Sequence, residues 1–199
     1  MKALVKIFVV ASLLTFTSVA QSGFLLEPYL NQSISGEATD SDPTNTLDAD
    51  ASHLLYGARV GWMTMMGLML GVDVQLGQGK WEFNGGGEVD TSMQDLGAFI
   101  GYQTMMGFRF FLSYMFQNKT TLEYTNQSDA ELSGSGFKLG VGYTFMNFGA
   151  PWFAINAEYH TNTFDECEQT NGCNGNLTYE VDQNAILLGV SFPIDFAVM

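Results

Sequence analysis

Residues 55–77 read LYGARVGWMTMMGLMLGVDVQLG, two alternating segments on either side of a short turn near 63–67. Apolar side chains occupy every second position at 56–62 and again at 68–76, and glycine, polar residues and one methionine, Met69, stand between them. Because successive side chains of a β-strand point to opposite faces, this period of two predicts a pair of antiparallel strands, each with one apolar face.

Similar segments follow along the rest of the chain. Their apolar positions lie at 96–102, 108–116, 137–143, 153–159 and 186–192. The turn recurs too, since GWMTMMG at 61–67 returns as GYQTMMG at 101–107. A further strand is expected at 24–32, where Pro28 and adjacent leucines weaken the alternation. The chain is therefore predicted to form eight strands of about ten residues in an up-and-down order.

Short and long connections alternate between these segments. The short turns are expected near 63–67, 103–107 and 145–151, and the long polar loops at 33–52, 78–92, 118–133 and 161–178. The loops hold most of the carboxylates. Short turns at one rim and long loops at the other are typical of outer-membrane barrels, so the predicted fold class is all-β, an eight-stranded antiparallel up-and-down transmembrane β-barrel.

The direction of the apolar face separates a membrane barrel from a secreted, lipocalin-like one. An eight-stranded barrel has an interior just wide enough for its own side chains or one small ligand. The apolar face carries too many large side chains for that interior, and the opposite face is rich in glycine, so the apolar face is predicted to contact lipid. Aromatic girdles are expected from Trp62, Tyr102 and Tyr143 on the turn side and from Tyr56, Tyr114 and Tyr159 on the loop side.

With that orientation, six charged side chains point into the lumen. They are Arg59, Arg109 and Lys138, together with Asp73, Asp95 and Glu158. Because a lone charge in a narrow lumen is poorly solvated, we expect these groups to pair as a structural network in which the formal charges cancel. The alternative is a gate in which Lys138 exchanges between Asp95 and Glu158 to admit ions.

The N-terminal segment has the layout of a secretory signal peptide. Lys2 and Lys6 precede an apolar run from Ile7 to Phe16, and small residues precede a cleavage point after Ala20. The uncharged run is shorter than the roughly 20 residues that a membrane-spanning helix needs, which disfavours an anchor helix. We expect a signal peptide at 1–20 and one barrel domain at 21–199.

Charge and cysteine content narrow the function further. Seven Lys and Arg residues stand against 21 Asp and Glu, a formal net charge of −14, so nucleic acid is not an expected partner. The two cysteines, Cys167 and Cys173, lie close together in the last loop of an exported chain, which predicts a loop disulfide.

Three other clusters are weighed as chemical sites. The aspartates at 40–50 lack the glycine and terminal glutamate of an EF-hand, and they are expected to solvate the first loop rather than to bind divalent ions beside lipopolysaccharide. The Met-Met-Gly turns are expected to fill the end of the barrel rather than to hold a metal. Glu158 and His160 suit acyl hydrolysis but lack an identifiable nucleophile, so no catalytic residue, cofactor or metal is expected.

Signal peptide, eight alternating segments, short turns opposite long loops and a charged lumen together resemble the small OmpA- and OmpX-type outer-membrane barrels of Gram-negative bacteria, over nearly all of residues 21–199. The resemblance implies an outer-membrane location and leaves several roles open. The expected function is non-enzymatic, a structural or adhesion-like surface role through four acidic extracellular loops. The alternatives are a narrow gated channel for small solutes or ions and, more remotely, a lipid-modifying enzyme. The expected partners are outer-membrane lipid, lipopolysaccharide and a surface ligand such as a host or prey surface, and the protein is expected to be a monomer.

Overall fold

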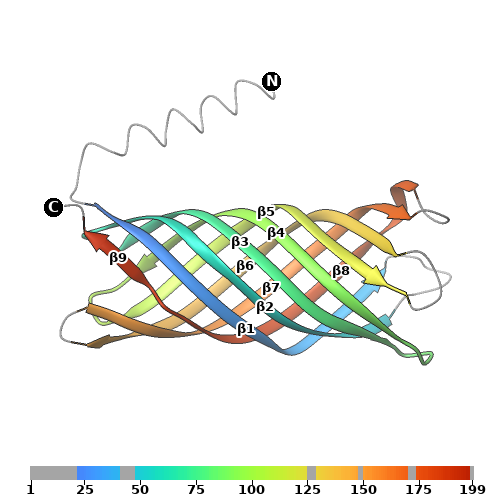
Figure 1. Ribbon diagram of the computed structural model, residues 1–199, viewed down its shortest axis with the longest axis horizontal. Coiled ribbons are helices and arrows are strands. Elements are labelled where there is room, and N and C mark those ends of the chain that lie inside the picture. Colours follow the sequence, from blue (N-terminus) through green and yellow to red (C-terminus); the bar gives the residue numbers. More distant parts are fainter. Residues whose placement is uncertain (1–21, 41–47, 125–128, 148–149, 170–173, 198–199) are drawn as a thin grey trace, which may run out of the picture.

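The computed structural model describes residues 22–40, 48–124, 129–147, 150–169 and 174–197. Within these ranges the regular structure is β-strand (Figure 1). The strands are β1 (Ser22–Asp40), β2 (Asp48–Thr64), β3 (Leu68–Phe83), β4 (Glu88–Gln103), β5 (Phe108–Glu123), β6 (Ala130–Asn147), β7 (Ala150–Gln169), β8 (Asn174–Ser191) and β9 (Ile194–Ala197). The predicted signal peptide at 1–20 lies outside the described residues.

The strands form one antiparallel sheet that closes on itself. Each of β1 to β7 pairs with the next strand along the chain, and β8 pairs with β1. β9 continues the last strand after a break at Phe192 and Pro193, and it pairs with β1 as well. The break lies opposite Pro28, which has no N–H for the ladder, and there Phe192 N donates to Pro28 O at 2.9 Å. The predicted eight-stranded up-and-down barrel is confirmed, with its last strand in two pieces.

The two repeated turns share one geometry. Gly67 N donates to Thr64 O at 2.8 Å, and Gly107 N donates to Thr104 O at 3.0 Å. Gly67 and Gly107 have φ angles of 87° and 90°, a left-handed conformation that glycine adopts without a steric cost. The repeated sequence is therefore a repeated turn. We call the end of the barrel that carries these turns the turn end, and the opposite end the loop end.

The prediction of four long polar loops is wrong. Strand pairing continues through most of each segment, so that β1 and β2 pair out to Thr39 and Asp48, and β3 and β4 pair out to Glu82 and Glu88. The connections shrink to 41–47, 84–87, 124–129 and 170–173. These segments alternate as the other strands do, but their outward positions carry carboxylates and hydroxyls, so their composition resembled that of loops.

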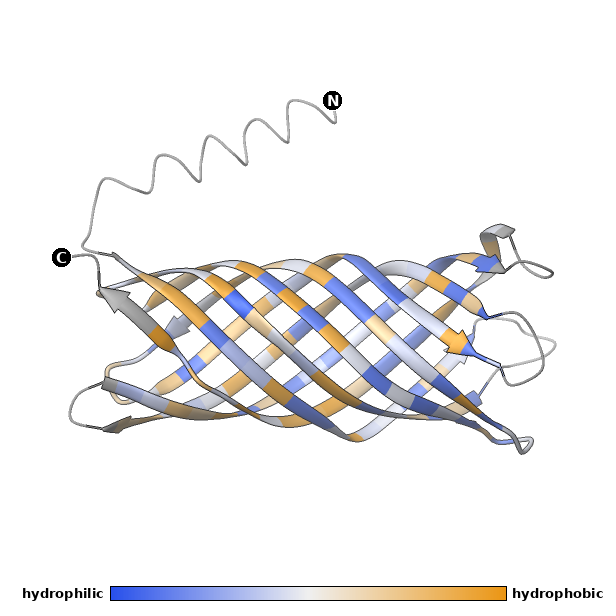
Figure 2. Ribbon diagram, in the orientation of Figure 1, coloured by the Kyte–Doolittle hydropathy of each residue, from blue (hydrophilic) through white to orange (hydrophobic). Residues whose placement is uncertain are grey.

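The outward face of the wall is apolar over the part that lies toward the turn end. Val72, Leu112 and Leu139 are 44%, 45% and 57% exposed there, although they are aliphatic. Figure 2 shows hydrophobic residues alternating along the strands in this part and hydrophilic residues gathering at the loop end. A band of exposed aliphatic side chains around a barrel is the surface that contacts lipid, so the barrel spans a membrane with its apolar face outward. The described residues contain no helix long and apolar enough to do so.

All six predicted girdle side chains point outward. They are Trp62, Tyr102, Tyr143, Tyr56, Tyr114 and Tyr159, with exposed fractions between 39% and 48%. Trp62 and Tyr102 lie next to the turns, and Tyr143 stacks edge-on against Phe108 with ring centroids 5.2 Å apart. Toward the loop end, the hydroxyl of Tyr159 donates to Asn184 Oδ1 at 3.0 Å. An aromatic body against lipid with a polar tip on a hydrogen bond is the arrangement that suits a membrane boundary.

Beyond the apolar band, toward the loop end, the polarity of the wall is reversed. The inward side chains form an apolar cluster of Ala38, Ala49, Ala51, Trp81, Val89, Leu122, Ala130, Leu132, Phe164 and Cys167. We call this part of the barrel the outer section. The boundary between the outer section and the membrane part is marked by irregularities at 33–36 in β1, 116–117 in β5 and 165–166 in β7. Across each irregularity the inward positions change between odd and even residue numbers.

Candidate functional site: a filled lumen and an acidic collar

The six charged side chains predicted for the lumen all lie buried inside it. Arg59, Arg109, Lys138, Asp73, Asp95 and Glu158 are at most 4% exposed. Glu27 on β1 is buried beside them and was missed, because the weak alternation of that strand hid which of its residues face inward. With Glu27, the described lumen holds one more acidic than basic side chain, so the expected cancellation of formal charges is wrong.

Arg59 lies at the centre of the network. Its guanidinium reaches three carboxylates, Glu158 Oε1 at 2.7 Å, Glu27 Oε1 at 3.3 Å and Asp73 Oδ2 at 3.6 Å. The same group covers the ring of Phe111, with Cζ 3.8 Å from the ring centroid. The planar, permanently charged fork of arginine suits such a position, because it bonds several carboxylates in its plane and stacks on an aromatic face. One side chain thereby ties together residues of four other strands.

Lys138 and Asp73 form a second centre. Lys138 Nζ donates to Gln75 Oε1 at 2.7 Å and to Asp73 Oδ2 at 3.2 Å. Asp73 also accepts hydrogen bonds from Tyr29 OH at 2.7 Å and from Ser113 Oγ at 3.0 Å. Several donors replace the water that a buried carboxylate loses. Tyr29, Gln75 and Ser113 are thus network members that a search for charge alone could not find.

Three of the buried ion pairs reach across the lumen, whereas Arg59 also pairs with Glu27 and Asp73 on the two neighbouring strands. Arg109 on β5 pairs with Glu27 on β1, which lies on the opposite side of an eight-stranded ring. The other two basic side chains join β2 to β7 and β6 to β3. Side chains that meet across the axis fill the cross-section, so the lumen at this level is a packed core.

The pairs expected for a gate are not the pairs that form. Lys138 bonds to Asp73 rather than to Asp95 or Glu158. Within the described part of the chain Asp95 makes no ion pair, and its Oδ2 accepts a hydrogen bond from Gln75 Nε2 at 2.7 Å. Asp95 is therefore held by a neutral amide, at the edge of the charged network.

Glu158 and His160, considered as a hydrolytic pair, do meet. His160 Nε2 lies 3.2 Å from Glu158 Oε2. Both side chains are nearly fully buried in the packed lumen, and the other oxygen of Glu158 is bonded to Arg59. A lipid ester on the outer wall has no access to this position, so the contact belongs to the packing of the lumen.

Apolar levels lie above and below the charged network. Read from the turn end, the inward side chains of β2 include Met63, Arg59, Leu55, His53 and Ala51. Met63 packs against an apolar cluster at the turn end. Leu55 belongs to a second apolar cluster, on the loop-end side of the network, and Ala51 belongs to the outer section. An ion moving along the axis would lose its hydration at each level, which is costly.

Carboxylates dominate the outward face of the outer section. We call them the acidic collar: Glu37, Asp48, Asp50, Glu82, Glu88, Asp90, Glu123, Asp129, Glu131, Asp165, Glu166, Glu168, Glu180 and Asp182. Two lysines stand among them, Lys80 paired with Glu88 and Asp90, and Lys119 paired with Glu131. The hydrogen bond to Glu88 raises the pKa of the Lys80 ammonium. The collar has a strong excess of negative charge, which attracts cations and basic surfaces.

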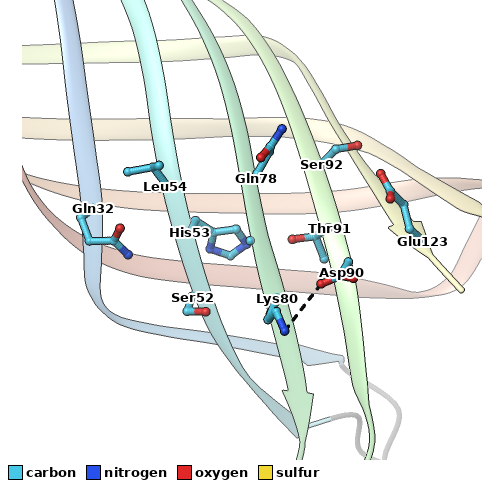
Figure 3. A pocket seen from close by; sticks show the side chains of 11 residues that line it. Gln32, Ser52, His53, Leu54, Gln78, Lys80, Asp90, Thr91, Ser92 and Glu123 are labelled. Carbon is cyan, nitrogen blue, oxygen red and sulfur yellow. Dashed lines mark ion pairs between the residues drawn. The ribbon is translucent and has the colours of Figure 1, made fainter. Parts of the chain in front are cut away.

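A hollow of ≈ 540 Å³ opens on the outer wall where the apolar band meets the collar (Figure 3). Leu54 contributes apolar surface, and Lys80 Nζ pairs with Asp90 Oδ1 across 3.8 Å. Hydroxyl and amide groups of Ser52, Ser92, Gln32 and Gln78 also line the hollow, together with His53, Thr91 and Glu123. This combination suits the headgroup of an amphiphile, whose sugar hydroxyls form hydrogen bonds and whose chains continue along the apolar band.

Several sequence expectations fall on the rims of the barrel. Cys167 is buried in the cluster of the outer section, whereas Cys173 lies outside the described residues, so the loop disulfide stays a prediction. Of the aspartates at 40–50, Asp42 is likewise outside, and Asp48 and Asp50 belong to β2 rather than to a loop. In the ranges the structure covers, no group of three or more His, Cys, Asp or Glu side chains is placed to hold a metal ion.

The methionine pairs of the turns do not fill the end of the barrel, contrary to expectation. Met65, Met66, Met105 and Met106 are 71%, 76%, 95% and 77% exposed. Inside the turn end lies instead the buried cluster of Leu25, Met69 and Phe99. The tight turns place the two positions before each glycine beyond that cluster, so their side chains point away from the barrel.

Comparison with known proteins finds likeness in solved structures. No protein-family model matches the sequence, and no curated protein matches it either. Neisserial surface protein A is 16% identical, with 85% of this chain and 96% of that chain covered at a TM-score of 0.48. OprG from Pseudomonas aeruginosa is 14% identical, with 88% and 96% covered at 0.48. Ail from Yersinia pestis, solved with the heparin analogue sucrose octasulfate, is 12% identical, with 88% and 100% covered at 0.43.

At these identities the likeness concerns the fold alone, and the membrane assignment follows from the molecule itself. A closed ring of antiparallel strands, an apolar outer band edged by aromatic side chains and a charged, packed lumen occur together in this barrel. That combination characterises the barrels of outer membranes. The chain is a small eight-stranded transmembrane β-barrel of the outer-membrane type.

Proposed function

We propose that this protein is a non-enzymatic surface barrel that presents the acidic collar to a cationic partner outside the cell. The observation that carries this proposal is the outer section, which continues the barrel past the apolar band with an apolar core of its own. Paired strands hold the carboxylates at fixed spacings, as long loops would not. A rigid surface of one charge steers and binds partners of the opposite charge, such as a basic protein or a polycation.

The orientation of the barrel follows from its two ends. β1 begins and β9 ends at the turn end (Figure 1). Outer-membrane barrels carry their short turns on the periplasmic side. With the turn end on the periplasmic side of the membrane, the collar stands beyond the outer leaflet, where it can meet another surface.

A narrow channel is the weaker function. Ion pairs that cross the axis support a closed lumen, and so do the apolar levels above and below them. Conduction would require several of these contacts to open together. We therefore assign the charged network to the stability of the barrel.

Lipid contact is the second part of the proposal. The hollow beside Leu54 lies at the level where headgroups of the outer leaflet begin, and its hydroxyl and amide groups suit the sugars of lipopolysaccharide. The apolar band leaves no polar break on the described wall that would suit a second subunit, which favours a monomer surrounded by lipid.

The collar is tested by neutralising part of it. The variant carries E82Q, E88Q, D90N and E123Q, on three neighbouring strands, and the control carries Q94A, Q117A, T121A and S133A at outward positions outside the hollow. Proteoliposomes containing each protein are bound to a surface coated with poly-lysine, at increasing NaCl concentrations. We expect the control to bind as the wild type does, with binding that falls as salt rises, and the neutralised variant to lose most of that binding.

The same preparations are examined for conductance in planar bilayers. We expect folded but silent barrels for all three proteins. Binding that survives neutralisation of the collar would overturn the surface role, and reproducible openings of the wild type would restore the channel.

A further inference from the structure

The methionines at the tips of the two repeated turns are the most exposed apolar side chains in the described structure. Met105 is 95% exposed, and Met65, Met66 and Met106 exceed 70%. Isolated apolar residues are common on protein surfaces, but four of them at the same end call for an explanation. Either they meet water or something apolar covers them.

The conformation of the turns does not require methionine. The positive φ angles fall on Gly67 and Gly107, and the positions before them accept most residue types. The tight connection at the loop end, 84–87, is built from Asn84 and three glycines. The same chain thus makes a water-exposed hairpin without apolar tips, so the methionines reflect their surroundings.

The hairpins at the turn end carry no charge. No Asp, Glu, Lys or Arg occurs at 60–72, 96–108 or 139–157. Nothing in these segments would have to give up ionic hydration if the turns entered a lipid leaflet. These uncharged hairpins contrast with the collar, because nearly all described carboxylates outside the lumen lie at the loop end.

The height of the apolar band is compatible with turns that lie in the leaflet. From Leu76 to Leu68 on β3 the band rises only about 20 Å, at about 3.3 Å per residue and a strand tilt of about 40°. The apolar band of outer-membrane barrels is about 25 Å tall. Continuing the count to Met66 adds the missing distance, about 5 Å. The same holds for β5, from Phe116 to Phe108 and on to Met106.

We propose that the turn end is seated in the phospholipid leaflet, with Met65, Met66, Met105 and Met106 in contact with lipid at the level of the girdle that Trp62 and Tyr102 form. The tips continue the lipid-facing band directly, since Trp62 and Tyr102 precede them along the same strands and are exposed on that band. An unbranched thioether adapts to a disordered apolar environment. The proposal concerns the end opposite the collar and does not depend on what the collar binds.

The test places the methionine methyl groups relative to lipid and water. The protein is labelled with carbon-13 at its methionine methyls and reconstituted in nanodiscs of phosphatidylethanolamine and phosphatidylglycerol, and signals are assigned by single Met→Leu substitutions. Relaxation is then measured with a lipid that carries a nitroxide near its headgroup and, separately, with a water-soluble gadolinium chelate. We expect the four tip methyls to relax several-fold faster with the lipid probe and to be protected from gadolinium.

Two controls bracket that result. The methyl introduced by Asn84→Met, in the exposed turn at the loop end, should respond to gadolinium and not to the lipid probe. Met115, which is fully buried in the lumen, should be protected from both. Tip methyls that respond to gadolinium as strongly as the Asn84→Met methyl would overturn the proposal. The methionine tips would then be in contact with water or with a soluble partner.

Discussion

Glu27 holds the lumen together through two arginines at once. One carboxylate oxygen lies 3.3 Å from Arg59 Nη1, and the other accepts a hydrogen bond from Arg109. Both arginines are buried, so bulk water could not solvate their guanidinium groups if the carboxylate of Glu27 were removed. Asp95 is as deeply buried but is bonded to the amide of Gln75. The two acids therefore differ in what their negative charge contributes.

The first prediction compares these two acids. Glu27→Gln should lower the unfolding free energy by about 3 kcal/mol, because it leaves the buried guanidinium of Arg109 without its counter-charge and removes one of the three carboxylates around Arg59. Asp95→Asn should change it by less than about 1 kcal/mol, since an amide can still accept from Gln75. Urea unfolding of protein in lipid vesicles measures both values. Equal losses would show that the pairing of Glu27 is not what distinguishes the two positions.

Gly140 makes room for the aromatic ring that supports Arg59. A Cβ on Gly140 would overlap the ring of Phe111, over which the guanidinium of Arg59 lies. Glycine in the wall thus permits a large side chain in a narrow lumen. This is the physical reason for at least part of the glycine on the inward face.

The second prediction concerns this contact. Gly140→Ala should destabilise the barrel by about 1–3 kcal/mol, the usual cost of overpacking. Gly85→Ala is the matched control, because no atom lies within 4 Å of a Cβ there, and it should change stability by less than about 0.5 kcal/mol. Thermal unfolding followed by gel mobility compares the two. A Gly140→Ala barrel as stable as the control would mean that Phe111 moves aside freely.

At the scale of the strand, a β-bulge in β5 shifts the inward positions from odd to even numbers at the boundary of the outer section. On β5, Met115 points inward, Phe116 and Gln117 both point outward, and Asn118 points inward again. Without the extra residue, inward and outward side chains of β5 would alternate regularly through this boundary. β4 crosses the same boundary without a bulge, and Gln94 keeps its place in a regular alternation.

The third prediction is a pair of single-residue deletions. Removing Gln117 should be tolerated, because Phe116 then precedes Asn118 with both still on their present faces. Removing Gln94 should prevent the outer section from folding, because Val89 and Met93 would turn outward and Glu88 and Asp90 inward. Heat-modifiable gel mobility and protection of the outer-section amides from hydrogen exchange distinguish the two variants. Equal folding of both deletions would contradict this account of the boundary.

At the scale of the whole molecule, two barrels of opposite polarity are stacked along one axis. The membrane part is apolar outside and charged inside, and the outer section is charged outside and apolar inside. Each arrangement suits its solvent, lipid in one case and water in the other. The outer section nevertheless concentrates carboxylates around one ring, and their mutual repulsion opposes folding.

The fourth prediction follows from that repulsion. Raising the salt from 0.01 M to 0.15 M shortens the Debye length from about 30 Å to about 8 Å, so the urea midpoint of unfolding should rise. The variant with E82Q, E88Q, D90N and E123Q should have a higher urea midpoint at low salt, and its midpoint should rise less as salt is added. Buried pairs such as Arg59–Glu158 are screened little and should not contribute to the difference. A midpoint independent of salt would mean that collar repulsion does not limit stability.

Much of the membrane part could be predicted from the sequence alone, because its signal is local. The period of two in 55–77 and its repeats determined the number of strands, their order and the outward direction of the apolar face. The same parity determined that Arg59, Asp73 and Lys138 point into the lumen. Each of these inferences needs only neighbours one or two positions away, since adjacent side chains of a strand face opposite ways.

The partners inside the lumen and the outer section were decided only by the closed ring. Arg109 and Glu27 are 82 residues apart in sequence, and Arg59 and Glu158 are 99 apart. Their pairing depends on the stagger of strands around the barrel, which no single strand contains. The outer section escaped notice because its alternation has the opposite polarity and is shifted by bulges, and that pattern makes physical sense only once the ring encloses a dry interior above the membrane.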